Sequence, residues 1–181
     1  MKKFKLTSEF IVDISGVKLF RIKALIEFGN VKAGDLGGYI EKEENLSHMG
    51  NAWVSGNAQV SGDARVFGNA WVFGDARVSG NARVSGDAQV FGDARVSGNA
   101  QVFGDARVSG DKDYAYAHGF GSCNRTTTFF RLKDGDVGVR CGCFYGTLAQ
   151  FRDNVCETHG ETKKAQEYLM LADLMDFRFK N

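Results

Sequence analysis

The chain has 181 residues, 43% of them hydrophobic, which suits one folded domain or a core with small flanking blocks. Its formal net charge of +1 gives no electrostatic case for a nucleic-acid or anionic-membrane partner, so we expect neither. No apolar run approaches the roughly 18 residues of a membrane span, and the opening residues MKKFKLTSEF lack the apolar core of a signal peptide. Four cysteines without a secretory segment suggest reduced thiols in a cytoplasmic protein.

The first part of the chain predicts a β-hairpin. Two apolar-rich runs, 10–14 and 17–22, flank the dipeptide Ser15-Gly16, which is a two-residue turn signal. A glycine-rich segment, 33–40, then leads toward the repeats. We assign residues 1–49 to an N-terminal β cap and lead-in.

The lead-in contains two residues at repeat spacing. Ile40 and Leu46 lie six apart and are interpreted as degenerate first repeats. Leu46 and Val54 lie eight apart, which indicates a two-residue insertion before the regular array.

Residues 50–111 form the repeat region, which contains ten consecutive hexads of the form G-[ND]-A-x-V-[SF] without an insertion and ends with Gly110-Asp111. A fixed short period dictates architecture before any local propensity does. In each hexad Ala and Val are two apart, so they point to the same side of a strand. The Gly-Asn or Gly-Asp pair supplies a corner, because both residue types tolerate positive φ. The pattern predicts a helix of strands with a narrow Ala and Val interior.

The hexads resemble those of hexapeptide-repeat proteins, in which an aliphatic residue is followed four positions later by a small one, as in Val54 and Ala58. The lead-in GDLGGYIEKEENLS, followed by GNAWVSGNA, is similar to the YdcK type found in bacteria and prophages. The resemblance covers roughly residues 17–111. It implies a left-handed parallel β-helix with three hexads per turn and often a homotrimer, and it implies little about activity.

Three hexads per turn place every third hexad on the same face. The first face then carries Trp53/Ser55, Trp71/Phe73, Gln89/Phe91 and Arg107/Ser109; the second carries Gln59/Ser61, Arg77/Ser79 and Arg95/Ser97; the third carries Arg65/Phe67, Arg83/Ser85 and Gln101/Phe103. The arginine rows have aspartates in neighbouring corners, so we expect a charge-balanced surface, with a phosphate-binding stripe as the alternative.

Large aromatic side chains gather along one edge of this prism, and they exceed what a soluble monomer normally exposes. We therefore expect them to be buried, either in a homotrimer interface or under the C-terminal block of the same chain. The candidate interface residues are Trp53, Phe67, Trp71, Phe73, Phe91 and Phe103. The ends of the coil would expose unpaired backbone, so the N-terminal hairpin and residues 112–181 are expected to cap them.

Residues 112–181 predict a small ββαα domain. Strands are expected over 126–132 and 137–144, joined by a turn with an Asp-Gly pair. Helices are expected over 148–158, with Thr147 as N-cap, and over 161–177. The run HGFGSCNRTTTFFRLKDGDVGVRCGCFYGTLAQF resembles a C-terminal domain of phage and bacterial proteins of unknown role. The predicted fold class is mainly β.

Acyltransfer is the first catalytic hypothesis, because hexapeptide-repeat enzymes resemble one another in using a histidine base beside bound acyl-CoA. The regular array has neither a histidine nor a loop insertion, and His48 precedes it. A general base must be positioned by a partner, and the sequence indicates none for His48. Catalytic residues are therefore not assigned.

A metal site is the second hypothesis, since His118, Cys123, Cys141 and Cys143 could supply four ligands. The C-x-C spacing differs from the C-x₂₋₄-C of structural zinc. Cys141 and Cys143 also share a strand face with valines, so we interpret them as small buried hydrophobic residues and expect no metal or cofactor. Nucleophilic catalysis by Cys123 with His118 has no further support.

The best local candidate for binding is a polar run at the start of the predicted C-terminal strand. Hydroxyl, backbone amide and guanidinium groups of this kind can hold a phosphate or a carboxylate, and aromatic residues beside them can stack on a flat group. An ordinary strand edge is the alternative. The candidate ligand-binding residues are Tyr116, His118, Ser122, Arg125, Thr126, Thr127 and Arg140.

The sequence as a whole favours a non-enzymatic binding protein on a trimeric β-helix of phage or prophage type. Such a protein would bind a host defence protein or sequester a small anionic nucleotide-type ligand. A CoA-dependent acyltransferase and a purely structural spacer are the alternatives.

Overall fold

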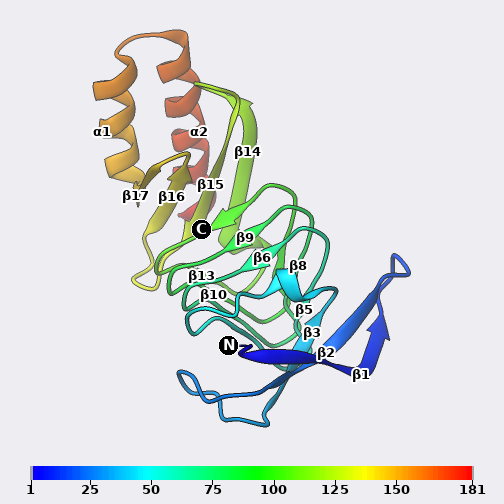
Figure 1. Cartoon of the computed structure of the whole chain (residues 1–181). Coiled ribbons are helices and arrows are strands. Elements are labelled where there is room, and N and C mark those ends of the chain that lie inside the picture. The colour runs from blue at the N-terminus through cyan, green and yellow to red at the C-terminus, as the bar shows by residue number, and fades with distance from the viewer. Residues whose placement is uncertain (1, 181) are drawn as a thin grey trace.

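A computed structural model describes residues 2–180 of the chain, which forms three successive blocks (Figure 1). Antiparallel strands at the N-terminus lead into a β-solenoid, and a sheet with two helices follows it. No helix among residues 2–180 is long and apolar enough to cross a membrane.

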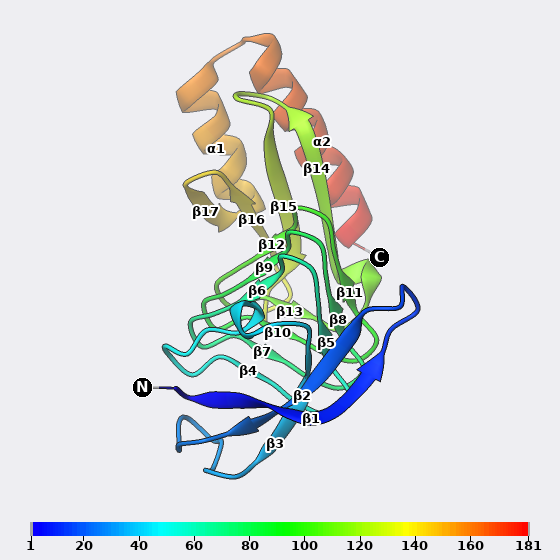
Figure 2. The ribbon, with the colours of Figure 1, turned by 45° about the vertical axis from the view of Figure 1, so that its right-hand side comes forward.

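The solenoid consists of two-residue strands, one per hexad, that stack in parallel on three faces (Figure 2). Partners lie 18 residues apart in register, as in Trp53 with Trp71. The predicted three hexads per turn and the contents of the three faces are therefore confirmed. The strands are β4 (Trp53–Val54), β7 (Trp71–Val72), β10 (Gln89–Val90) and β13 (Arg107–Val108) on the first face; β5 (Gln59–Val60), β8 (Arg77–Val78) and β11 (Arg95–Val96) on the second; β6 (Arg65–Val66), β9 (Arg83–Val84) and β12 (Gln101–Val102) on the third.

The interior of the solenoid is filled by the Ala and Val of every hexad, which are at most 1% exposed from Ala52 to Val108. In the corners only the glycine adopts positive φ, whereas the following Asn or Asp does not. The glycine is also required for space. A Cβ on Gly86 would lie 2.7 Å from the backbone nitrogen of Gly104 in the next coil.

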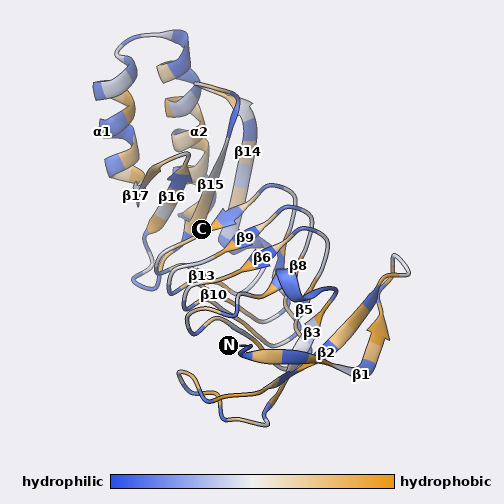
Figure 3. Ribbon diagram, viewed as in Figure 1, coloured by the Kyte–Doolittle hydropathy of each residue, from blue (hydrophilic) through white to orange (hydrophobic). Residues whose placement is uncertain are grey.

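The N-terminal block joins the solenoid through a shared sheet in the order β1-β2-β3-β5-β8-β11. The predicted hairpin is confirmed and is longer than expected, with β1 (Phe4–Val12) and β2 (Lys18–Ala24), and β3 (Leu36–Ile40) follows. Its hydrophobic residues extend to the end that projects beyond the solenoid, where Phe10 and Val12 are exposed (Figure 3).

The lead-in follows the repeat as predicted. Ile40 pairs with Val60 and Leu46 with Val66, so both act as degenerate repeats. Each pair is 20 residues apart rather than 18, which places the two extra residues between Leu46 and the first regular hexad. A short 3-10 helix, η1 (Glu43–Asn45), separates the two repeats.

Side-chain donors satisfy carbonyl groups at the N-terminal end of the coil. The buried Lys3 ammonium donates to the carbonyl oxygens of Gly50 at 3.2 Å and Ala52 at 2.7 Å. The Asn45 amide, which is fully buried, donates to two more carbonyls, those of Gly62 and Ala64, at 3.0 and 2.9 Å. A buried backbone polar group without a partner is costly, so these contacts close this end.

At the C-terminal end of the coil, side-chain acceptors satisfy backbone amide groups. The backbone amides of Arg95 and Ser109 donate to the carboxylates of Asp111 and Asp113, both at 2.9 Å. A third amide, from Gln101, donates to the hydroxyl of Thr128, also at 2.9 Å. These residues therefore cap the last coil.

The C-terminal block differs from the predicted ββαα domain, because its antiparallel sheet has four strands. They are β14 (Tyr114–Phe120), β15 (Arg125–Arg131), β16 (Val137–Cys141) and β17 (Phe144–Thr147). The run predicted as one strand over 137–144 reverses at Gly142, whose φ is +59°. Residues 114–120, in which tyrosine and alanine alternate at the start, form the edge strand β14. A short 3-10 helix, η2 (Asp111–Asp113), joins the solenoid to this sheet.

Two helices cover one face of this sheet, α1 (Leu148–His159) and α2 (Lys163–Phe179). Thr147 caps α1, as predicted, and Gly160 follows its last residue. Phe151 of α1 and Tyr168 of α2 lie in one hydrophobic core with Phe129 of the sheet.

We expect glycine at a solenoid corner to be less replaceable than glycine in the hairpin turn. Gly86 and Gly16 both have positive φ, +73° and +81°, but a Cβ on Gly16 would have no atom within 4 Å. Each Ala substitution should cost about 1–2 kcal/mol in backbone strain. Gly86→Ala should cost about 1–3 kcal/mol more, because the neighbouring coil must move. Urea unfolding measures both, and equal losses would contradict the close approach.

The free energy of unfolding should depend on pH because the Lys3 ammonium is buried. Burial lowers its pKa from 10.5 to about 8. Between about pH 8 and pH 10.5 the unfolded chain keeps a proton that the folded chain has released, so stability should rise with pH in that window. The rise should reach about 2 kcal/mol by pH 9.5.

Urea unfolding at pH 7 and pH 9.5 tests this effect with a matched pair of variants. Lys3→Met should remove the rise, whereas Lys5→Met, at an exposed position two residues further along the chain, should keep it. An unchanged pH dependence in Lys3→Met would show that the Lys3 ammonium is not its source.

Candidate functional site

The candidate ligand-binding residues occupy opposite faces of the C-terminal sheet. Tyr116, Thr128 and Arg140 are directly paired across three strands and share the face toward the solenoid. Thr127 alternates to the other face, is 1% exposed, and donates to the sulfur of Cys141 at 3.2 Å. The structure therefore does not bring Thr127 together with the others.

The remaining candidates already have protein partners. The Ser122 amide donates to the Tyr168 hydroxyl at 3.0 Å. His118 Nδ1 and the Thr126 hydroxyl are 3.0 Å apart on the exposed part of the sheet. Arg125 reaches over the turn at Gly142. These contacts agree with the alternative of an ordinary strand edge with hydroxyl caps.

Two of the six candidate interface aromatics are covered by other parts of the same chain. Trp53 is 3% exposed and packs edge-on against Phe28, with ring centroids 5.4 Å apart. Phe103 packs edge-on against Tyr145 at 5.0 Å, and the Arg140 guanidinium lies over its ring. Both flanking blocks therefore cover aromatic side chains of the solenoid. For Phe103 the cover is the C-terminal block, which was one of the two expected covers.

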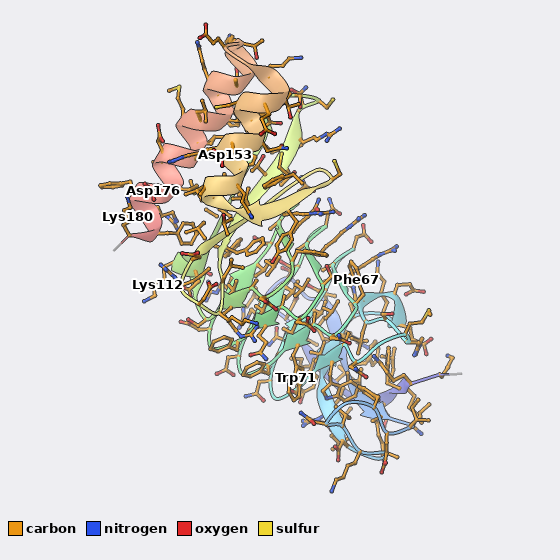
Figure 4. The ribbon with its side chains drawn as sticks, turned by 90° about the vertical axis from the view of Figure 1, so that its left-hand side faces the viewer. Phe67, Trp71, Lys112, Asp153, Asp176 and Lys180 are labelled. Carbon is orange, nitrogen blue, oxygen red and sulfur yellow. The ribbon has the colours of Figure 1, made fainter. Side chains whose placement is uncertain are left out.

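The other four candidates are uncovered or half-buried. Trp71, Phe73 and Phe91 form a row on the first face, with centroid distances of 6.0 Å and 5.1 Å between successive rings. Phe67 is 38% exposed and belongs to the third face. Figure 4 shows Trp71 and Phe67 on the same side of the molecule.

The cysteines do not behave alike. Cys141 is buried in the core between the sheet and the helices, as predicted. Cys143 is exposed, because the reversal at Gly142 takes it out of the strand, so its interpretation as a buried residue is wrong. No group of three or more His, Cys, Asp or Glu residues is placed to hold a metal within 2–180.

His48 has partners that the sequence did not indicate, and they oppose a role as general base. Its Nδ1 accepts the backbone amide of Lys3 at 3.1 Å, and its ring stacks on Phe4 at 4.3 Å. In a neutral imidazole whose Nδ1 is the acceptor, the proton resides on Nε2. Nε2 lies 3.7 Å from a carboxylate oxygen of Glu43. The basic lone pair is therefore already engaged.

A groove of about 610 Å³ lies where the first face of the solenoid meets the C-terminal domain, and we call it the junction groove. Its volume lies within the range of small-molecule sites, about 300–1,000 Å³. Lys112 lies at this junction, near the end of α2 (Figure 4). The lining residues are Phe91, Arg107, Ser109, Lys112, Asp113, Arg131, Leu132, Lys133, Gly135 and Arg178.

Neutral carbonyl groups hold the guanidinium groups of the junction groove. Arg107 donates to the carbonyl oxygens of Asp87 and Ala106, at 3.1 and 3.0 Å. Arg178 donates to the carbonyl of Asp111 at 3.2 Å. Carbonyl partners fix the position of a guanidinium without cancelling its charge, so these groups are held ready for an anion.

The lining of the junction groove is strongly unbalanced in charge, with five cationic side chains and one carboxylate. That carboxylate, Asp113, is buried and lies 3.7 Å from Arg131. Lys133 pairs with Asp105 at 3.0 Å. Lys112 forms no ion pair with any residue of 2–180. The chain as a whole carries only +1, so the groove concentrates positive charge that the composition does not reveal.

This groove could not be predicted from the sequence, because its cations come from four separate places in the chain. The last hexad, η2, the end of β15 with its turn, and the last turn of α2 each contribute. No local motif joins them. The one available signal was the change of composition after Asp111, which placed binding chemistry where the repeat ends.

Comparison with protein families agrees with the central block. Residues 58–74, 76–90, 88–102 and 100–111 match the family model described as YdcK Beta solenoid repeat. No curated protein matches the chain. The matched residues end at 111, so the likeness of the C-terminal block to phage proteins remains a prediction. The solenoid of this chain is thus similar to the YdcK β-solenoid repeat, in its hexads and in its three-faced coil.

Proposed function

We propose that the chain is a non-enzymatic binding protein that holds a small anionic nucleotide-type ligand in the junction groove. The observation that carries the proposal is the convergence of five cationic side chains on one groove of small-molecule size. Guanidinium and ammonium groups form the strongest hydrogen bonds with phosphate oxygens. The Phe91 ring, at the border between groove and aromatic row, offers a surface for a flat base.

The biological setting is part of the same proposal. The phage resemblance of the C-terminal block supports a prophage protein that sequesters a nucleotide-type signal or occupies a host defence protein. Four free cysteines, three of them exposed, support a reducing compartment such as the cytoplasm. The engaged lone pair of His48 weighs against the acyltransferase alternative.

Binding of ADP, measured by calorimetry at low salt, tests the small-ligand version. Lys112→Gln and Arg178→Gln should each weaken ADP binding about tenfold, because each removes one charge-assisted contact. Added salt should weaken binding further. Arg77→Gln is the matched control, since Arg77 is exposed on the second face outside the junction groove and Gln occupies this repeat position elsewhere.

Two outcomes would reject the small-ligand version. One is the absence of any melting-temperature shift across a panel of nucleotides and pyrophosphate. The other is an equal loss of affinity in Arg77→Gln, which would show that bulk charge rather than the groove binds the ligand. The version of the proposal in which the junction groove binds a host protein would then remain. In that version Lys112→Gln should weaken binding of the host protein.

We further propose that the scaffold is a left-handed homotrimer, as the resemblance implies. The row of Trp71, Phe73 and Phe91 supports an interface along the first face, since these rings remain only half-buried within one chain. Phe67 would lie at the rim of that interface. The alternative role as a spacer or assembly protein requires the homotrimer but no ligand in the junction groove.

Native mass spectrometry should detect a trimer that the double variant Phe73→Ser, Phe91→Ser converts to a monomer. Serine occupies the same repeat position in Ser55 and Ser109, so the coil should tolerate both changes. Gln59→Arg, on the second face, should leave the trimer intact. A monomeric parent protein, or a trimer unaffected by the double variant, would refute this interface.

A further inference from the structure

A second pocket, of about 530 Å³, lies at the opposite end of the solenoid and has a different charge pattern. It lies between η1 and the third face, and we call it the lead-in pocket. Its lining residues are Glu43, Glu44, Leu46, Ser47, His48, Arg65, Val66, Phe67 and Arg83. Neither the predicted ligand-binding residues nor the junction groove overlaps it.

One wall of the lead-in pocket is cationic. Arg65 and Arg83 are paired in register on successive coils, so their backbones lie about 4.8 Å apart. Both are exposed, and neither has an ion-pair partner within residues 2–180. The sequence predicted charge balance on this surface. Asp63, in the corner before Arg65, forms its ion pair with Lys42 at 2.8 Å, and Lys42 and then Arg65 hold the pKa of its carboxyl below the usual range.

The corner that precedes each third-face strand adds no carboxylate beyond Asp63. After Asp63 the corresponding corner positions are Asn81 and Asn99, whose side-chain amides bond to each other at 3.1 Å. Two guanidinium groups are therefore free to hold one carboxylate or phosphate group.

The opposite wall of the lead-in pocket is acidic. Glu43 pairs with Lys2 at 2.7 Å, and this contact holds the pKa of Glu43 below its usual range. Glu44 is exposed and pairs with no cation of the described chain. The pocket thus presents a free carboxylate on one side and two free guanidinium groups on the other.

A hydrophobic side chain lies in the pocket beside the charged residues. Phe67 is 38% exposed, whereas Leu46 and Val66, which also line the pocket, have their side chains buried in the core of the solenoid. Phe67 replaces the serine found in the neighbouring hexad of the same face, Ser85. The phenylalanine therefore adds apolar contact at the one coil where η1 covers the third face.

We propose that the lead-in pocket binds a small zwitterion that carries a flat ring. Its anionic group would meet Arg65 and Arg83, its ammonium group would meet Glu44, and its ring would pack on Phe67. A polyanion of the kind proposed for the junction groove would be repelled by the acidic wall. The two sites therefore select different ligands, and this inference does not depend on the proposed function.

Three related probes separate the contributions of the two walls. L-phenylalanine has both charges, 3-phenylpropionate lacks the ammonium group, and phenethylamine lacks the carboxylate. Amide chemical shifts of the full chain should move at Ser47 and Phe67 on titration with L-phenylalanine. Each of the other two probes should bind about tenfold more weakly, since each lacks one charge-assisted contact.

Single variants assign each contact to one wall of the pocket. Arg83→Gln should weaken L-phenylalanine and 3-phenylpropionate about tenfold and leave phenethylamine unchanged. Glu44→Gln should weaken L-phenylalanine and phenethylamine and leave 3-phenylpropionate unchanged. Arg77→Gln, at the same repeat position of the second face, should change none of them.

The proposal is overturned if no probe shifts Ser47 or Phe67, or if 3-phenylpropionate binds as tightly as L-phenylalanine. It is also overturned if Arg77→Gln weakens binding as much as Arg83→Gln. Phe67→Ser should weaken all three probes while keeping the fold, because serine is native to this position of the repeat. If Phe67→Ser binds the three probes as tightly as the parent protein does, the proposed packing of the ligand ring on Phe67 is wrong.

Discussion

The structure depends on the need of each coil to find hydrogen-bond partners in the coils on either side. A two-residue strand has too few internal contacts to be stable alone, so the repeat is stable only as a stack. The Ala and Val interior adds burial, but it is nearly identical in every coil and cannot define an end. The ends are defined where side chains replace the missing coil: Lys3 and Asn45 at one end, and Asp111, Asp113 and Thr128 at the other.

This capping explains where positive charge collects. Asp113 is buried because its carboxylate must reach the amide and hydroxyl of Ser109, at 2.9 and 2.6 Å. A buried carboxylate favours a nearby cation, and Arg131 supplies it. Arg107 and Arg178 satisfy carbonyl groups of the same region, which are neutral. Closing the coil therefore leaves more cations than carboxylates at the junction.

The regular part of the fold could be predicted because its period fixes its geometry. Six residues per side determine which residues face inward and which hexads share a face, and all three faces agree with the sequence analysis. The reversal at Gly142 could not be predicted in this way. A glycine inside an apolar run is compatible with a strand, and only its φ of +59° reveals the reversal that creates β17 and exposes Cys143.

The candidate site could not be predicted in the same way, because it depends on contacts distant in sequence. Thr127 and Thr128 belong to one polar run, yet one contacts Cys141 in the core and the other caps Gln101 of the solenoid. The alternation of a strand separates neighbours in sequence, while the ends of the coil join residues far apart. Arg107 and Arg178 line the same groove only because α2 returns to the last coil.

The regular array is a poor place for a binding site, and its periodicity is the reason. In the middle of a face each side chain stacks on a counterpart in the next coil, as Arg77 does between Gln59 and Arg95. Such rows are nearly flat, and a small ligand needs a concave site. Concavity arises where a non-repeating element interrupts a row. The 3-10 helix η1 does this beside Arg65, and the chain after Asp111 does it beside Arg107, so both pockets lie outside the regular hexads at the ends of the array.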